Sequence, residues 1–207
     1  MGRFVTGSLT IKTMAALPVP RLSVEEYLAL DRAAEVPSEY HDGEMFPVTA
    51  VTWEHIQIGI SLSGMLKVAL RGKPCKVSGT LLKVRVSPSK FLLPDLVVVR
   101  GEPAFTDPRR DTVTNPRVVI EILSPSTADY DYGEKFILYR RLPSFEEYLL
   151  VSQDQARVEV YRKTADGGWL LSTYLGRETV VPIESVGVDL PLAEVYSEVE
   201  FPPSAEE

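Results

Sequence analysis

The stretch that decides the fold is Arg117–Thr127, with the sequence R-V-V-I-E-I-L-S-P-S-T. It is rich in valine, isoleucine and leucine and is bounded by prolines, so the pattern predicts a buried β-strand. Glu121 stands in the middle of this strand. A charge on a strand that is apolar on both faces loses its hydration, which is costly unless another group replaces the water. A lysine or arginine, a proton, or a metal ion could each neutralise Glu121. An ion pair that only stabilises the fold is the structural alternative to a functional site.

Composition narrows the class of protein. The chain has 207 residues, of which 44% are hydrophobic and 25% charged, which fits one globular domain with an ample core. No apolar run approaches the ~20 residues of a membrane span, and no secretory signal is evident, so we expect a cytoplasmic protein. The single cysteine, Cys75, excludes an intramolecular disulfide and a cysteine-based zinc site. Any metal is therefore expected to be a hard cation held by carboxylates.

We expect a disordered extension at residues 1–20, one domain at 21–200 and a tail at 201–207, because organised sequence begins only near Leu22. Ser23 with Glu26 forms a capping box that predicts a helix ending near Ala34. Asp42-Gly43 predicts a turn into a strand over 44–51, and Glu39 before it is expected in a loop or at a helix end.

Periodicity predicts the remaining elements. Apolar residues at helical spacing indicate a helix over 52–71, with His55 in its first turn, where a lone histidine is usually structural. A further helix is expected over 129–141 and a short one over 192–198. Residues 102–115 are expected to form a loop. Strands are expected over 75–78, 81–87, 93–99, the Glu121 stretch, 147–152, 157–163 and 169–174. The helix between the Glu121 strand and the 147–152 strand implies that these two strands are parallel, which favours a mixed α/β sheet.

The charge is unevenly distributed. The net charge of −7 and the pI of about 5.0 argue against a nucleic-acid partner for the chain as a whole. Between His55 and Pro94, however, there is no acid, and seven bases occur: Lys67, Arg71, Lys73, Lys76, Lys83, Arg85 and Lys90. This stretch is either a solvated face or a surface that contacts phosphates.

Asp95 and Glu121 are the chemically informative acids, because each stands on an apolar strand and only a loop separates the two strands. If the strands are neighbours, both carboxylates can point to one side of the sheet. Two adjacent carboxylates cannot both stay charged unless a cation joins them. A divalent cation such as magnesium could do so, and it could activate water for attack on a phosphate. The alternative for Asp95 alone is a strand cap at a turn.

These residues resemble the acidic core of the PD-(D/E)XK nuclease superfamily, and the chain is more closely similar to its Uma-type family of predicted restriction endonucleases. The resemblance covers roughly residues 22–197. The matching segments are S-E-Y-H-D-G-E at 38–44, E-H at 54–55, P-D-L-V-V-V at 94–99, V-V-I-E-I-L-S-P-S-T at 118–127, D-Y-G-E-K-F-I-L-Y at 131–139, E-Y-L-L-V at 147–151 and V-E-V-Y at 158–161.

The resemblance implies a restriction-endonuclease-like mixed β-sheet flanked by helices, with additional antiparallel strands at the C-terminal end. It implies that Asp95 and Glu121 bind Mg²⁺, with Mn²⁺ as a possible substitute, and that the Ile122 carbonyl is a further ligand. It gives Glu39, at the end of the first helix, a place in the metal site. His55 and Asp131 fall on characteristic family positions and are second-rank site residues.

The sequence departs from the superfamily pattern at the position two residues after the glutamate, where Leu123 replaces a lysine. In this family the lysine corresponds to Lys135 on the following helix, whose long side chain could reach the site. The structural alternative for Lys135 is an exposed position on the helix. The alternative for Asp131 is a negative charge near the helix N-terminus that interacts favourably with the helix dipole. Ser38 and Ser152-Gln153 also differ from the family's usual residues.

The first functional hypothesis is a magnesium-dependent endonuclease of DNA. Glu39, Asp95, Glu121 and Lys135 would form its catalytic set, and the basic stretch would grip the DNA backbone. A homodimer is expected because cutting both strands of a duplex favours two-fold symmetry. The alternative is a nuclease-like fold without catalysis that serves as a binding or dimerisation module. A two-carboxylate glycoside hydrolase fits poorly, because neither Trp53 nor Trp169 is near the acids in sequence.

Overall fold

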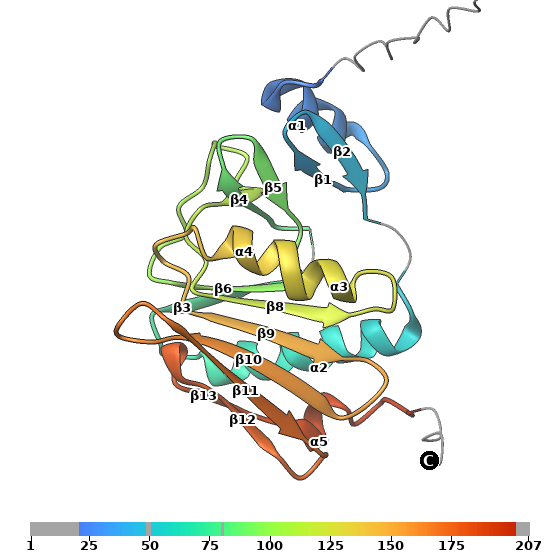
Figure 1. The fold of residues 1–207 in the computed structure, drawn as a ribbon, viewed down its shortest axis with the longest axis vertical. Helices are drawn as coiled ribbons and strands as arrows, with labels where there is room; N and C mark the ends of the chain where they lie inside the picture. Colours follow the sequence, from blue (N-terminus) through green and yellow to red (C-terminus); the bar gives the residue numbers. More distant parts are fainter. Residues whose placement is uncertain (1–20, 49–50, 80, 202–207) are drawn as a thin grey trace, which may run out of the picture.

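The centre of the molecule is a six-stranded sheet in the order β11-β10-β9-β8-β6-β3 (Figure 1). The computed structural model describes residues 21–48, 51–79 and 81–201. The strands of this sheet are β3 (Cys75–Ser78), β6 (Leu96–Arg100), β8 (Val118–Leu123), β9 (Glu147–Ser152), β10 (Arg157–Lys163) and β11 (Trp169–Leu175). β8 and β9 are parallel, as the crossover helix predicts, and the other neighbours pair antiparallel. The expected mixed α/β sheet is confirmed.

The pairing of β6 with β8 brings the two informative acids together. Leu96 pairs with Ile120 in an antiparallel register, so extending the register by one residue puts Asp95 opposite Glu121. Residues directly opposite one another in an antiparallel pair lie on the same face of the sheet. The expectation that both carboxylates share a face therefore holds.

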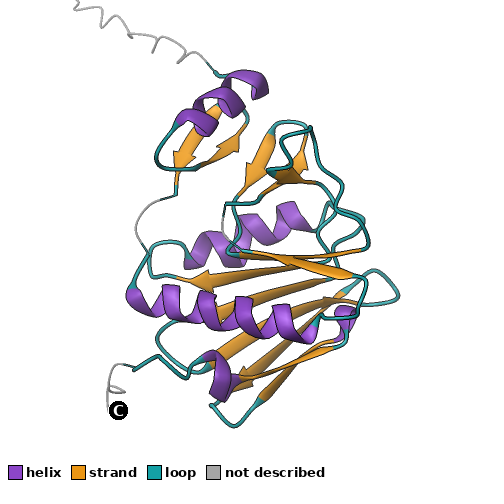
Figure 2. Cartoon of the chain, turned by 180° about the vertical axis from the view of Figure 1, so that it is seen from behind, coloured by secondary structure: helices purple, strands orange, loops and turns teal. Residues whose placement is uncertain are grey.

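One face of this sheet is covered by α2 (Trp53–Ala69), which lies across it in Figure 2. Ile58, Leu62 and Leu66 of α2 are fully buried. They pack in one core with the side chains of β6, β8 and β9 on this face of the sheet. The same core is completed by the C-terminal elements, including an antiparallel hairpin. These are β12 (Val180–Ile183), the 3₁₀ turn η2 (Glu184–Val186), β13 (Val188–Pro191) and α5 (Leu192–Val195). They are the additional C-terminal strands that the resemblance implies.

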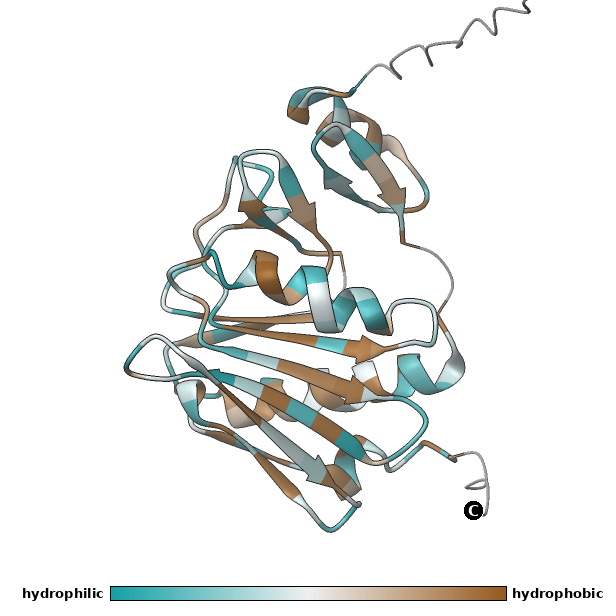
Figure 3. Ribbon diagram, viewed as in Figure 1, coloured by the Kyte–Doolittle hydropathy of each residue, from teal (hydrophilic) through white to brown (hydrophobic). Residues whose placement is uncertain are grey.

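The opposite face is covered by one run of helix that contains a π-helical turn. It consists of α3 (Ala128–Tyr130), the π turn η1 (Asp131–Lys135) and α4 (Phe136–Tyr139), drawn as a continuous helix in Figure 1. Phe136 stacks on Tyr148 of β9 with 5.6 Å between ring centroids and meets Trp169 of β11 at 5.1 Å. Strand β9, covered on both faces, is brown along most of its length in Figure 3, whereas β10 carries several teal segments.

A second sheet of five strands, in the order β2-β1-β5-β4-β7, stands beside the first. Its strands are β1 (Ser38–His41), β2 (Glu44–Pro47), β4 (Lys83–Ser87), β5 (Lys90–Leu92) and β7 (Thr112–Val113). The β1–β2 turn has positive φ at Asp42 (49°) and Gly43 (104°), the conformation that the Asp-Gly pair favours. The helix α1 (Val24–Ala33), with the expected capping box, packs on this sheet through stacked Tyr27 and Tyr40.

A buried ion pair joins α1 to the second sheet. Asp31 Oδ2 lies 2.6 Å from Lys83 Nζ, and both side chains are almost fully buried. The other oxygen, Asp31 Oδ1, accepts a hydrogen bond from the backbone N–H of Ser38 at 2.7 Å. The pair therefore fixes the start of β1, which carries Glu39.

Several segments differ from the sequence prediction. Residues 38–41 form strand β1, so Glu39 is on a strand rather than in a loop or at a helix end. The residue pattern did not assign strands to the positions of β5, β12 and β13, and β7 lies within the segment predicted as a loop. These strands are two to four residues long, and pairing with distant segments defines them more than their own pattern does. The predicted extension at 1–20 and most of the tail at 201–207 lie outside the described residues. No described helix is long and apolar enough to cross a membrane.

Replacing Lys83 with methionine should destabilise the fold strongly. Lys83→Met leaves the Asp31 carboxylate buried without its counter-charge, which costs about 3–5 kcal/mol for a buried pair. Lys76→Met is the matched control, because Lys76 pairs with Glu102 at an exposed position, where such pairs contribute about 1 kcal/mol or less. Urea unfolding of both variants measures the difference, and equal midpoints would contradict a stabilising role for the Asp31–Lys83 pair.

Candidate active site

The predicted site residues converge on one pocket of about 780 Å³. The pocket lies where the β1–β2 hairpin, the start of α2 and the helix α3–η1 meet the ends of β6 and β8. Its lining includes Glu39, Asp95, Glu121, Ile122, Lys135, His55 and Asp131. All seven residues proposed for catalysis, metal binding or a second-rank role therefore line one cavity, although they come from five different segments of the chain.

The pair of Glu121 and Lys135 lies at the floor of the pocket. Glu121 on β8 is 2% exposed and Lys135 on η1 is 7% exposed, and Lys135 Nζ lies 3.1 Å from Glu121 Oε1. Tyr139 OH donates to the same oxygen at 3.0 Å. Lys135 thus does not occupy an exposed helix face. Its side chain reaches the sheet from the helix behind it, as the resemblance requires.

Lys135 also contacts two further carboxylates. Its Nζ is 2.9 Å from Asp131 Oδ1, one π turn earlier, and 3.6 Å from Glu39 Oε1. Burial alone would lower the pKa of Lys135, but Glu121, Glu39 and Asp131 outweigh it and raise that pKa well above its usual value. Lys135 therefore stays protonated. A π turn is rare and is frequently found at functional sites.

Two carboxyl groups of the pocket, those of Glu121 and Asp131, have pKa values above their usual range. Burial raises the pKa of Glu121 well above 4.5, against the attraction of Lys135, and the neighbouring Asp131, Asp95 and Glu39 add to the rise. Burial likewise raises the pKa of Asp131. One lysine thus does not compensate the group of acids, and the site carries an excess of negative charge that must be balanced by protons or by a cation.

Asp95 is held by two contacts at the entrance of β6. Its Oδ1 lies 2.8 Å from Nε2 of His55, and its Oδ2 accepts the backbone N–H of Ile122 at 2.7 Å. Asp95 is therefore more than a strand cap, because it connects β8 with the first turn of α2. His55, in the first turn of α2, lines the same pocket and contacts Asp95 there.

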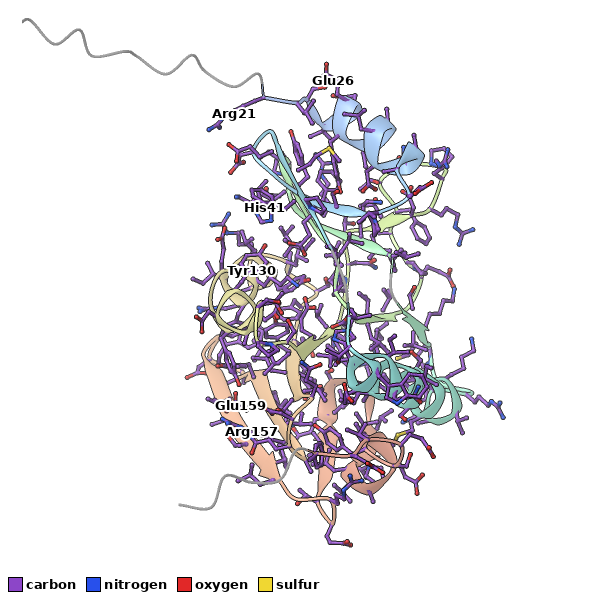
Figure 4. All side chains as sticks on the ribbon, turned by 90° about the vertical axis from the view of Figure 1, so that its right-hand side faces the viewer. Arg21, Glu26, His41, Tyr130, Arg157 and Glu159 are labelled. Carbon is purple, nitrogen blue, oxygen red and sulfur yellow. The ribbon has the colours of Figure 1, made fainter. Side chains whose placement is uncertain are left out.

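Glu39 lines the pocket and accepts two hydrogen bonds there. Its Oε1 accepts the backbone N–H of Leu93 at 2.9 Å, and its Oε2 accepts the hydroxyl of Tyr130 at 3.0 Å. Burial would raise the pKa of Glu39, but Lys135, His41, Leu93 and Tyr130 together lower it, so Glu39 is ionised. Figure 4 shows His41 and Tyr130 on facing elements, and their OH to Nε2 distance is 2.9 Å.

Tyr130 and His41 were missed by the sequence analysis. Tyr130 directly precedes the matching segment at 131–139, and His41 lies inside S-E-Y-H-D-G-E, but neither residue carried an expected role. Their function depends on the contact between β1 and α3, which lie about 90 residues apart in the chain. No local pattern could indicate that contact.

The donor chemistry of the pocket fits a hard divalent cation. Carboxylate oxygens are the ligands that magnesium and manganese prefer, and Asp95 and Glu121 face the same cavity. Within residues 21–48, 51–79 and 81–201, no three histidine, cysteine or acidic side chains already surround a common point. Glu121 is engaged by Lys135 and Asp95 by His55, so these residues would have to exchange contacts to hold an ion together.

Most of the bases expected to contact nucleic acid lie outside the lining of this pocket. Of the seven bases, Lys90 is in the lining. Lys83 is buried against Asp31 and cannot contact nucleic acid, which corrects that prediction. Lys67 is exposed on α2 but lies 12 residues beyond His55, or about 18 Å along the helix axis. Three of the remaining bases have partners within the protein. Lys76 pairs with Glu102, Lys73 donates to the carbonyls of Val186 and Gly187, and Arg85 donates to those of Ser87 and Pro88. Arg71 is exposed beyond the end of α2.

Comparison with known proteins agrees with this architecture. Residues 24–193 match the model of the Uma2 family, described as "Putative restriction endonuclease". Two proteins of Synechocystis sp. (strain PCC 6803) are similar along most of their length. "Uncharacterized protein sll1609" is 33% identical over 161 residues, covering 77% of this chain and 91% of its own, and "Uncharacterized protein slr1290" is 32% identical over 189 residues, covering 89% and 96%.

A solved structure has the same fold. It is described as a putative nuclease belonging to DUF820 from Anabaena variabilis and superposes with a TM-score of 0.69 at 17% identity, covering 85% of this chain and 98% of its own. The protein therefore has a restriction-endonuclease-like fold. Because the family model matches most of the chain, the protein belongs to the Uma2 family, described as "Putative restriction endonuclease".

Proposed function

We propose that this protein is a magnesium-dependent endonuclease that hydrolyses phosphodiester bonds of DNA. The observation that carries the proposal is the convergence of Glu39, Asp95, Glu121 and Asp131 on one pocket around the buried ammonium of Lys135. A purely structural ion pair needs one acid for one base. Here several acids share one lysine, and perturbed carboxylates gathered in a cleft are typical of functional sites.

Each residue then has a role. Asp95, Glu121 and the Ile122 carbonyl would hold Mg²⁺, for which Mn²⁺ could substitute, and Glu39 would assist them. A bound divalent cation polarises the phosphate and favours deprotonation of water. Lys135 would orient the attacking water or stabilise the charge that develops on the phosphate. His55 would orient Asp95, Asp131 would hold Lys135, and Tyr130 would hold Glu39.

A nuclease-like fold without catalysis is the second reading, and one observation favours it. The carboxylate of Glu121 already has Lys135 and Tyr139 as partners, so its negative charge is partly compensated without a metal. In this reading the protein binds or dimerises through the same fold. Metal binding by Asp95 and Glu121 distinguishes the two readings.

Two further properties belong to the proposal. A cytoplasmic location is in keeping with the single cysteine of the sequence. A homodimer would supply two active sites for the two strands of a duplex, and light scattering of the purified protein measures its mass.

Wild-type protein should bind Mn²⁺ and Mg²⁺ in isothermal titration, and the double variant Asp95→Asn, Glu121→Gln should not. The double variant removes two anionic ligands while it keeps the shape of both side chains. Glu102→Gln is the matched control, because Glu102 is an exposed acid that pairs with Lys76 away from the pocket, and it should bind metal like the wild type.

Thermal unfolding of the three proteins without metal shows whether each is folded. Absence of metal binding by the folded wild-type protein, with DNA present to complete the coordination shell, would falsify the metal-dependent mechanism. Glu121 would then be a structural partner of Lys135.

Lys135→Met should separate metal binding from catalysis. The variant keeps the volume of the side chain but removes the ammonium, so cleavage of DNA under single turnover should fall by about 10²–10³-fold, as for other preorganised stabilising groups. Mn²⁺ binding should persist, because the anionic ligands remain. Lys163→Met, at an exposed position on β10, should cleave DNA normally. Undiminished cleavage by Lys135→Met would remove Lys135 from the catalytic set.

A further inference from the structure

The reactive groups lie at the bottom of the pocket and not on its rim. Glu121, Glu39 and Lys135 are 2%, 5% and 7% exposed, respectively. A phosphate that is to approach them must enter the cavity. A cavity of about 780 Å³ is of the size that holds a small molecule or a short part of a chain. A DNA duplex is wider than its major groove, which alone measures about 12 Å, so the whole duplex cannot enter a cavity of this size.

The wall of the pocket offers a surface for a base. Phe46 on β2 lines the cavity, and 48% of the residue is exposed. The ring of His41 meets it edge-on, with 5.5 Å between centroids and 86° between planes, which leaves the orientation of Phe46 defined. Pro47 and Val48 continue the same apolar wall. Exposed aromatic rings beside a cavity are the platforms on which unpaired bases stack.

The charge of the pocket does not suit the backbone of a duplex. Proteins that bind duplex DNA neutralise several phosphates with lysine and arginine. This pocket is lined by five acids (Glu39, Asp95, Glu121, Asp131 and Glu134) and by Lys90 and Lys135 as its lysines. Lys90 is paired with Asp42 at 2.8 Å, and Lys135 is shared by three of the acids. Both lysines of the lining are thus engaged by acids, so the wall of the pocket can supply stacking but not the neutralisation of several successive phosphates.

We infer that the pocket binds an unpaired nucleotide strand, with one base stacked on Phe46 and the adjoining phosphate directed toward Asp95 and Glu121. The inference rests on the proposed nuclease function and specifies its substrate: a single strand, or an unpaired segment of a duplex, is cleaved in preference to continuous duplex. Two active sites related by symmetry are not required for such a substrate.

The test measures binding by fluorescence anisotropy and cleavage with Mg²⁺, using short single-stranded DNA, single-stranded RNA of the same sequence and the matching blunt duplex. Wild-type protein should bind the single strand more tightly than the duplex, and it should cleave the single strand faster. Phe46→Ala should weaken single-strand binding by about 5- to 150-fold, the usual effect of losing one stacking contact. The RNA arm shows whether the sugar is distinguished.

Two control variants make the test specific to stacking. Phe46→Trp keeps an aromatic face and should retain binding, whereas Phe46→Ala does not. Leu175→Ala removes exposed apolar surface on β11, away from the pocket, and should have no effect. Unfolding midpoints show whether each variant is folded.

The outcomes also separate this inference from the proposed function. Cleavage of duplex as fast as single strand, or no effect of Phe46→Ala, overturns the inference while the nuclease function stands. Single-strand binding that depends on Phe46, without cleavage in Mg²⁺ or Mn²⁺, supports the pocket as a nucleotide site and overturns catalysis. Neither binding nor cleavage of any of the three probes overturns both.

Discussion

The contact between Glu121 and Lys135 is the interaction on which the arrangement of the site depends. A carboxylate buried at the centre of a sheet is costly unless a cation or proton compensates it. Here the compensation comes from a helix that packs on the same face, 14 residues later in the chain, across a distance of 3.1 Å. The contact fixes the π turn Asp131–Lys135 against β8 and draws Asp131 and Glu39 toward the same ammonium.

The second sheet completes the pocket by bringing Glu39 to it. β1 is positioned by its pairing with β5 and by the Asp31–Lys83 pair, whose aspartate also accepts the N–H of Ser38. Lys83 therefore contributes to the site through the placement of β1, not through contact with a substrate. The same hairpin supplies Phe46, so one element carries both an acid of the floor and the aromatic wall. Loss of the α1–β1 contact is thus expected to affect the chemistry as well as the stability.

Much of the sheet could be predicted from the sequence. Buried strands such as 147–152 have a continuous apolar centre, here Tyr148–Val151, and the pattern predicted their bounds because burial on both faces favours apolar side chains at successive positions. The short strands β1, β5, β7, β12 and β13 could not be predicted, since hydrogen bonds to distant partners define them. Lys83 was expected on a surface that faces solvent or phosphates because it stands in a basic stretch without acids, but it is buried against Asp31 of α1. Tyr130 and His41 were missed for the same reason, because their contact is between β1 and α3.

The sequence by itself determined the chemistry available to this protein: a buried acid on an apolar strand, a second acid after a proline on the preceding strand, and a lysine on the following helix. It determined these because the local pattern of apolar residues indicates which strands are buried, and therefore which charged side chains must lose their hydration. Only the tertiary structure decided their geometry. It placed Asp95 opposite Glu121 through strand register, turned Lys135 to the sheet through a π turn, and closed the pocket with a lining in which acids outnumber lysines and the ring of Phe46 is exposed. Register, helix packing and the direction of charged side chains depend on contacts between segments far apart in the chain, and no local pattern encodes them.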